Sequence, residues 1–163
     1  TKRISAENAI NCIAGFMTTN DVSARDWNMR EDWVTLRTDW FGGKSHDTFA
    51  PMGPYFVPRA FVPDHMNLRL TLKVNGETKQ DGNTGDMVFS PEEQIEFASE
   101  MITLESGDIL STGTPAGVGH GVGLSVVAEL TLTGHGVRCK SPYQCSIHKV
   151  WRGLDPCLFL SFR

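Results

Sequence analysis

Alternating apolar and polar positions between residues 68 and 82 predict a β-hairpin. Leucine or valine stands at positions 68, 70, 72 and 74, with polar residues between them. This period of two places the apolar side chains on one face of an extended strand. Asn75 and Gly76 follow, a dipeptide that readily adopts the positive backbone angles of a two-residue turn. The segment is therefore predicted to fold back on itself as two antiparallel strands.

Two segments carry helical signals. Serine, proline and glutamate at positions 90, 91 and 93 supply an N-cap, a first-turn proline and a capping box, and the apolar positions after them predict a helix to about Met101. Near the start of the chain, Ser5 is predicted to cap a short helix with Ala6, Ala9, Ile10 and Ile13 on one face. Gly15 is predicted to end that helix before a strand.

The remaining pattern favours strands over helices. Residues 108–111 and 124–134 are predicted strands, whereas the last 26 residues show no persuasive period. Residues 28–43 mix charged and large apolar side chains and close on Gly42 and Gly43, which suggests a surface loop or lid with a glycine hinge. Helices seldom separate the strands, so the pattern predicts a β-rich α+β domain rather than a doubly wound parallel sheet.

Composition narrows the class of protein. The 163 residues are 40% hydrophobic and 21% charged, as in an ordinary globular domain, and the net charge of −4 argues against a nucleic-acid partner. No run approaches the ~18 apolar residues of a membrane helix, and no secretory signal opens the sequence. We expect a cytoplasmic protein without a membrane partner, with a mitochondrial location as the alternative.

The last part of the chain differs in composition. Residues 124–163 carry five basic and two acidic residues, against ten and 17 in residues 1–123. Three of the four cysteines, Cys139, Cys145 and Cys157, also lie there. No CxxC pair and no zinc-like histidine spacing accompany them, so free thiols are favoured over a zinc module.

The first candidate for chemistry is the stretch TTNDVSARDW, residues 18–27. A carboxylate just after a strand is rigidly held, and Asp21 is suited to Mg²⁺, Mn²⁺ or Ca²⁺, although an Asx-turn or a cap would use the same residue. Arg25 either grips a substrate carboxylate through its two-pronged guanidinium group or pairs with Asp26 to hold the loop.

Two later stretches add further candidates. Lys44 follows two glycines and could offset negative charge on an enolate or oxyanion, or could be a solvated surface lysine. His46 and Asp47 beside it are poor candidates for a dyad, because neighbours in an extended chain point to opposite faces. In STGTPAGVGHGVG, residues 111–123, backbone amides and the hydroxyl of Thr112 or Thr114 could cradle an anion, or the stretch could be a flexible loop. Neither GxGxxG nor GxxxxGK is present, which excludes the common nucleotide-binding loops.

Four blocks in a fixed order resemble one known family. NDVSARDW, GKSHDTFAPMGP, VNGETKQDGNTGDMVF and ESGDILSTGTPAGVG are similar to the catalytic domain of the fumarylacetoacetate hydrolase family. The resemblance covers about residues 5–121, with a weaker echo in residues 126–137. It divides the chain into a catalytic domain, residues 1–137, and a divergent tail, residues 138–163.

The resemblance implies a mixed β-roll with two short helices, a homodimer, and metal-dependent cleavage of a carbon–carbon bond in an oxo-acid or diketo-acid. Decarboxylase, isomerase and lyase reactions are the alternatives within the family. By the resemblance, Asp21 is a ligand of Mg²⁺, Mn²⁺ or Ca²⁺, Lys44 is catalytic and faces the substrate with Thr114, and Arg25 lies at the site. Asn28 stands where the family often has glutamine, one methylene longer, so a substrate contact there is expected to be lost or changed.

One feature of the family is missing from these 163 residues. Its metal is also held by a Glu-x-Glu pair that is expected upstream of where this sequence begins, and no Glu-x-Glu occurs in the chain. Two hypotheses follow. The chain is the catalytic portion of a metal-dependent hydrolase or lyase, or it is a truncated, inactive relative that serves as a dimerising or binding module.

Overall fold

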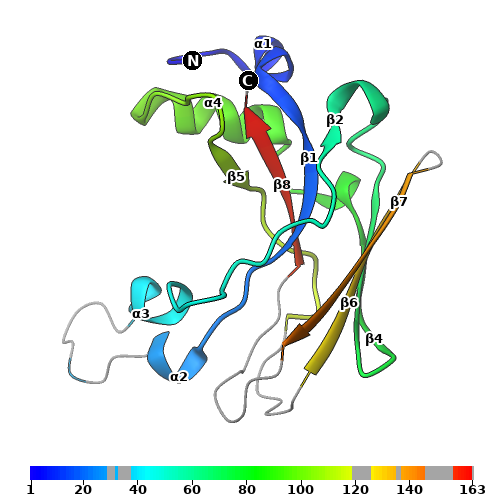
Figure 1. Cartoon of the computed structure of the whole chain (residues 1–163). Helices are drawn as coiled ribbons and strands as arrows, with labels where there is room; N and C mark the ends of the chain where they lie inside the picture. The colour runs from blue at the N-terminus through cyan, green and yellow to red at the C-terminus, as the bar shows by residue number, and fades with distance from the viewer. Residues whose placement is uncertain (29–31, 33–37, 119–125, 135–136, 146–155, 163) are drawn as a thin grey trace.

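The computed structural model of the chain describes residues 1–28, 32, 38–118, 126–134, 137–145 and 156–162 (Figure 1). Side chains are described as far as residue 118, except that of Arg25. Within these ranges the chain forms two small antiparallel sheets and few helices, which agrees with a β-rich α+β fold.

The two sheets have four strands each. The first has the order β2-β1-β8-β5, and the second has the order β4-β3-β6-β7. The strands of the first sheet are β1 (Ile13–Asn20), β2 (Val57–Pro58), β5 (Ile109–Ser111) and β8 (Pro156–Phe162). Those of the second are β3 (Arg69–Val74), β4 (Glu77–Asn83), β6 (Val126–Gly134) and β7 (Val137–Cys145). Figure 1 shows β1 and β8 running side by side, with β6 and β7 forming a separate ribbon.

The predicted hairpin is confirmed. β3 and β4 pair antiparallel, and Asn75 and Gly76 make the turn with φ angles of 52° and 83°. A β-bulge shifts the register between Lys73, which pairs with Thr78, and Leu72, which pairs with Gln80. One extra residue on β4 therefore changes which of its side chains face the same way as Leu72.

The second predicted helix is also confirmed, as α4 (Pro91–Met101). The Ser90 hydroxyl accepts a hydrogen bond from the Glu93 backbone N–H at 3.2 Å, and the Glu93 carboxylate accepts one from the Ser90 N–H at 2.7 Å. Both partners of the capping box are thus satisfied, and proline fits the first turn because its missing N–H is not needed there. Two 3₁₀ turns, η2 (Arg59–Phe61) and η3 (Thr84–Asp86), lie on either side of the hairpin.

The predicted N-terminal helix is wrong in length. α1 spans only Ala6–Ala9, a 3₁₀ turn η1 (Ile10–Cys12) follows, and β1 already begins at Ile13. Ser5 occupies the N-cap position without a side-chain cap, since its hydroxyl accepts a hydrogen bond from the Asn8 side-chain Nδ2 atom at 2.9 Å and not from a backbone N–H. Gly15 lies inside β1, paired with Pro58 and Ser161. Strand pairing on both sides therefore extends β1 into the segment whose local pattern indicated a helix.

Gly42 and Gly43 do not form a loop hinge. They lie inside α3 (Trp40–Lys44), and a further one-turn helix, α2 (Arg25–Asn28), precedes it, so the described residues contain four α-helices rather than two. The Asp39 carboxylate accepts a hydrogen bond from the Gly42 N–H at 2.8 Å and caps α3. This cap, which offsets the low helix propensity of glycine, explains the difference. The rest of the predicted lid, residues 29–31 and 33–37, lies outside the described residues.

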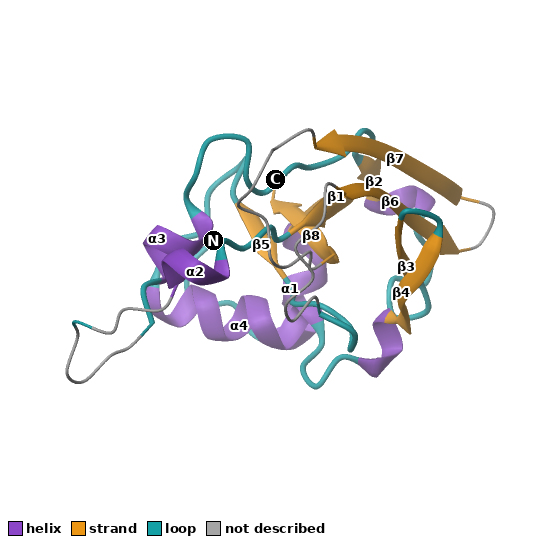
Figure 2. Ribbon diagram, turned by 90° about the horizontal axis from the view of Figure 1, so that it is seen from below, coloured by secondary structure: helices purple, strands orange, loops and turns teal. Residues whose placement is uncertain are grey.

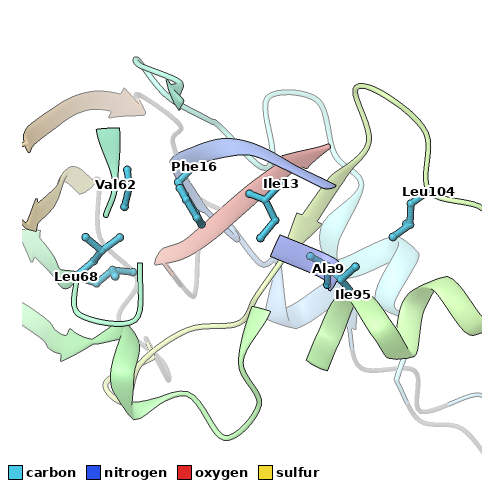
Figure 3. Close-up of a cluster of buried hydrophobic side chains, with 8 residues drawn as sticks. Ala9, Ile13, Phe16, Val62, Leu68, Ile95 and Leu104 are labelled. Carbon is cyan, nitrogen blue, oxygen red and sulfur yellow. The ribbon is translucent and has the colours of Figure 1, made fainter. Parts of the chain in front are cut away.

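The main cluster of buried apolar side chains joins the first sheet to the helices and to the start of the hairpin (Figure 3). Phe16 and Ile13 extend from β1, and Ile95 of α4 lies against Ala9 of α1. The cluster consists of Ala9, Ile13, Phe16, Val62, Leu68, Leu70, Ile95 and Leu104. Burial of such side chains contributes roughly 1.5–3 kcal/mol for each large one, which fixes α4 across the sheet.

Part of the predicted tail is built into both sheets. β7 pairs with β6, and β8 lies between β1 and β5. The sequence of this region shows no persuasive period. For β8, which has β1 on one side and β5 on the other, the physical reason is that such a strand is fixed by its partners as much as by its own pattern. The view in Figure 2 shows α2 and α3 beside each other, away from the second sheet.

Candidate active site

The end of β1 is held by side-chain hydrogen bonds to the segment of residues 51–53. The Thr18 hydroxyl donates to the Gly53 carbonyl at 2.8 Å, and the Thr19 hydroxyl donates to the Pro51 carbonyl at 3.0 Å. Both threonines are buried, so their bonds are shielded from competing water. The residue that follows this anchored end, Asp21, therefore starts from a fixed position.

Asp21 and Lys44 form an ion pair. The Lys44 ammonium donates a hydrogen bond to the Asp21 Oδ2 atom, which joins the end of β1 to the end of α3. The Lys44 side chain is 24% exposed and that of Asp21 is 38% exposed, so both groups are reachable from solvent. The structure thus brings together two of the residues that the sequence proposed for chemistry.

Contacts between α2 and α3 set the position of Lys44. The Ala24 N–H donates to the Gly43 carbonyl at 2.9 Å, and the Asp39 N–H donates to the Asn28 carbonyl at 2.8 Å. A Cβ atom on Gly43 would lie 2.7 Å from the Cβ of Asn28, closer than real side chains approach. Only glycine allows the two helices to come this near, and Lys44 is the next residue.

Trp40 shapes the surroundings of the lysine. The Lys44 Nζ atom lies 5.6 Å from the centre of the indole ring, within the range of a cation–π contact. The indole is 59% exposed. An exposed aromatic ring beside a partly shielded ammonium group offers both an apolar and a charged surface to a small organic anion.

Asn28 is almost fully buried, with 3% exposure, and lies against Gly43. Its Oδ1 atom has no hydrogen-bond partner among the described residues. Arg25 opens α2, but its side chain lies outside the described residues. Contacts of Asn28 and Arg25 with a substrate therefore stay predictions.

A cavity of about 460 Å³ opens beside α2 and α3. It is lined by Asp26, Trp27, Asp39, Phe41, Gly42, Ser45 and His46. The His46 Nε2 atom lies 2.7 Å from the Gly42 carbonyl, and its ring contacts those of Trp27 and Phe49 at centroid distances of 5.5 and 4.9 Å. These contacts hold the turn after α3. Asp47 is exposed, and no hydrogen bond or ion pair joins it to His46 among the described residues.

Thr114 lines a different cavity, of about 420 Å³. Leu70, Thr84, Phe89 and Gln94 share this lining, whereas Asp21 and Lys44 do not. The described structure therefore joins Asp21 to Lys44, and it places Thr114 at a cavity that neither of these two residues lines.

Gln80 is the residue at Thr114 that the sequence analysis missed. Its side chain is 1% exposed, and its Nε2 atom donates to the Thr114 hydroxyl at 3.1 Å and to the Pro115 carbonyl at 2.7 Å. The polar run from Glu77 to Asp81 gave no sign of a buried member. Gln80 is buried because the hairpin register places it directly opposite Leu72, on the same face of the sheet, and the β-bulge that sets this register leaves no mark in the sequence.

The described residues do not by themselves form a metal cage. No group of three or more histidine, cysteine, aspartate or glutamate side chains within the described ranges is placed to hold an ion. Asp21 supplies one carboxylate, and this is bonded to Lys44. Mg²⁺ needs several well-placed oxygens, so one paired carboxylate is insufficient. In the same ranges, no helix is long and apolar enough to cross a membrane.

Comparison with known proteins matches most of the chain to one family. The family described as "Fumarylacetoacetate (FAA) hydrolase C-terminal" matches residues 1–144. Human mitochondrial oxaloacetate tautomerase FAHD2A is 46% identical over 118 residues, which are 72% of this chain and 36% of the relative. The match thus spans little more than a third of the length of that relative.

Solved structures show the same likeness. The 2-hydroxyhepta-2,4-diene-1,7-dioate isomerase of Mycobacterium marinum has a TM-score of 0.67 at 36% identity, covering 86% of this chain and 52% of that one. The maleylpyruvate hydrolase of Sphingobium has a TM-score of 0.66 at 27% identity, covering 86% of this chain and 48% of that one. The names of these relatives are those of tautomerase, isomerase and hydrolase enzymes.

Proposed function

Since the chain belongs to the fumarylacetoacetate hydrolase family, we propose that it acts on a small oxo-acid by stabilising the enolate of that substrate at Lys44. The observation that carries this proposal is the ion pair between Lys44 and Asp21, which presents a partly shielded ammonium group beside the ring of Trp40. An oxo-acid loses a proton from the carbon next to its keto group to a base, such as a water molecule in the site, and the charge moves to the keto oxygen. A fixed cation near that oxygen stabilises the charge as it develops.

Tautomerisation or isomerisation is the reaction best supported. The human relative at 46% identity is named an oxaloacetate tautomerase, and the Mycobacterium marinum relative is named an isomerase. Both reactions can proceed by moving a proton between two positions of one molecule, through an enolate. Thr114 is proposed to bind a substrate oxygen, and Arg25 and Asn28 are proposed to contact the substrate.

Carbon–carbon bond hydrolysis is the second candidate. The Sphingobium relative is named a maleylpyruvate hydrolase. In this reaction water adds to a carbonyl, the neighbouring carbon–carbon bond breaks, and the departing fragment leaves as an enolate. Lys44 would stabilise that enolate in the same way. Decarboxylase and lyase reactions would also pass through an enolate. Identification of the reaction products distinguishes all these reaction types.

Mg²⁺, Mn²⁺ or Ca²⁺ at Asp21 stays a prediction from the family resemblance. When bound, such an ion polarises the oxygens of a substrate as a Lewis acid. The described residues contribute one carboxylate to it, so further ligands would have to come from elsewhere. The mixed β-roll and the homodimer are likewise proposed from the family. The compartment is proposed to be mitochondrial or cytoplasmic, and the human relative is named as mitochondrial.

The test follows oxaloacetate as its enol and keto forms interconvert, by ultraviolet absorbance, with the purified chain at fixed metal concentration. We expect turnover that Lys44→Met lowers by about 10²-fold, the usual cost of removing a group that stabilises developing negative charge. Lys79→Met is the matched control, because Lys79 pairs with Glu77 at 2.7 Å on the hairpin. Equal loss in both variants would contradict the role of Lys44.

Product analysis distinguishes the alternatives. A diketo-acid split into two fragments with uptake of water would favour the hydrolase over the tautomerase. Binding of oxalate without any turnover would favour the alternative of a catalytically inactive binding module. If the chain shows neither oxalate binding nor turnover of an oxo-acid, the proposed function is overturned.

A further inference from the structure

Gln80 holds the loop that carries Thr114 from beneath. It lies on β4, almost fully buried, and its Nε2 atom makes two hydrogen bonds to the loop after β5. The backbone of β4 also lies close to the loop at Gly82, because a Cβ atom on this glycine would lie only 2.7 Å from the Cβ of Pro115. A Cβ atom on Gly117 would lie 2.3 Å from the Lys79 carbonyl oxygen. The loop therefore lies directly on β4, and Gln80 is its polar connection.

The direction of these bonds follows from chemistry. A backbone carbonyl only accepts hydrogen bonds, so the atom of Gln80 that lies 2.7 Å from the Pro115 oxygen must be the amide nitrogen. The same nitrogen lies 3.1 Å from the Thr114 hydroxyl, so its second proton is donated to that oxygen. The threonine oxygen thus accepts from Gln80, and its own proton is available to another group.

Among the residues of the loop that the structure describes, the Thr114 proton has only one weak acceptor. The Thr114 hydroxyl lies 3.5 Å from the Pro115 carbonyl, at the limit of a hydrogen bond. That carbonyl already accepts the shorter bond from Gln80. An oxygen of a ligand in the adjoining cavity would therefore offer the hydroxyl a better acceptor.

We propose that Gln80 is a positioning residue, which orients the Thr114 hydroxyl so that it donates its proton to an anionic or carbonyl oxygen of the bound oxo-acid. The ligand part of this inference rests on the proposed function, whereas the orientation of Thr114 is a property of the chain without ligand. Gln80 acts only through Thr114 and touches no substrate itself. The free proton of the Thr114 hydroxyl favours an acceptor, such as a carboxylate oxygen, at this position.

The first test needs no ligand. The methyl signal of Thr114 and its three-bond couplings, which report the χ1 rotamer, are measured by NMR in the chain and in Gln80→Met. Methionine keeps the volume and removes both donors, and it also removes a buried Oε1 atom that has no partner among the described residues. We therefore expect the fold to survive while the Thr114 methyl signal shifts and its couplings average over rotamers.

Asp81→Asn is the matched control. Asp81 is the next residue on β4 and is bonded to Arg69 on the exposed face at 2.6 Å, away from Thr114. Its replacement is expected to leave the Thr114 signal unchanged. An unchanged Thr114 signal in Gln80→Met, or an equal change in Asp81→Asn, would overturn the positioning role.

The second test uses oxalate as a probe of anion binding, by isothermal titration calorimetry. Dissociation constants are compared for the unchanged chain, Gln80→Met, Thr114→Val and the double variant. We expect Gln80→Met to weaken oxalate binding by about three- to tenfold, the usual effect of one neutral hydrogen bond. When Thr114 is already valine, Gln80→Met should not weaken oxalate binding further, because no hydroxyl remains to orient.

The outcomes separate the two proposals. If Gln80→Met weakens oxalate binding equally in the unchanged chain and in Thr114→Val, Gln80 only stabilises the loop, and the positioning role is overturned. If the unchanged chain neither binds oxalate nor turns over oxaloacetate, the proposed function and the ligand contact of Thr114 both fail. The NMR comparison still decides whether Gln80 orients Thr114.

Discussion

The Lys44 ammonium is bonded to the Asp21 carboxylate, so the two residues that the family resemblance assigns to catalysis and to metal binding neutralise each other. An ammonium group competes with a divalent cation for the same carboxylate. At close range the two positive charges also repel each other by about 1 kcal/mol or more. The affinity of the divalent cation that the family resemblance predicts at Asp21 should therefore depend on the position of Lys44.

Removing the lysine charge should strengthen binding of a divalent cation. We expect Lys44→Met to tighten Mn²⁺ binding by about tenfold, because the carboxylate loses its competing partner and the local repulsion. Asp21→Asn should abolish the saturable Mn²⁺ binding that the family resemblance predicts at this residue. Isothermal titration with Mn²⁺ measures both, and Lys79→Met on the exposed hairpin is the control. Weaker Mn²⁺ binding in Lys44→Met would show that the lysine does not compete at Asp21.

The capping box of α4 should give the fold a pH dependence in acid. The backbone N–H of Ser90 and then its hydroxyl hold the pKa of the Glu93 carboxyl below its ordinary value of 4.5. Since the pKa is lower in the folded chain, the stabilisation is complete above pH 4.5 and is lost as the pH falls through the folded value. A carbon NMR titration of Glu93 checks this. A midpoint at or above 4.5 would contradict the capping role.

Two glycines with similar backbone angles should respond differently to alanine. Gly113 and Gly117 have φ angles of 96° and 102°, so alanine costs similar backbone strain at both. Only at Gly117 would the new Cβ meet a backbone atom, the Lys79 oxygen at 2.3 Å, whereas nothing lies within 4 Å at Gly113. Gly117→Ala should lower the free energy of unfolding by about 1–3 kcal/mol more than Gly113→Ala, measured by urea denaturation. Equal losses would show that the loop does not lie on β4.

Two apolar positions of α4 should differ in how much an alanine substitution lowers the free energy of unfolding. Ile95 is fully buried, and Ile95→Ala should lower the free energy of unfolding by about 2–5 kcal/mol through lost contacts and a cavity. Phe97, two residues further on, is 69% exposed, and Phe97→Ala should change the free energy of unfolding by only about 0.5 kcal/mol. Urea denaturation of both variants gives the comparison. A large loss at Phe97 would mean that this face of α4 is covered in solution.

The sequence alone was sufficient to predict a local structure where the residues that cause it lie within the same short stretch. The hairpin turn at Asn75 and Gly76 and the capping box at Ser90 and Glu93 depend on local backbone angles and on neighbours within three residues. The family membership also followed from the sequence, because four separate blocks occur in a fixed order, and the match over residues 1–144 confirms it. The metal ligand, the substrate contacts and the tail boundary stay predictions.

Tertiary structure decided the features that depend on partners far along the chain. Pairing with β2 and β8 turned the end of the expected helix into β1 and placed Gly15 inside a strand. The bulge in the hairpin placed Gln80 opposite Leu72, where unbroken pairing from the turn would have placed Lys79. A shift of one residue moves a side chain to the other face of a sheet, and no local pattern records it. The ion pair between Asp21 and Lys44 arises likewise from the meeting of β1 and α3, because the residues lie 23 positions apart.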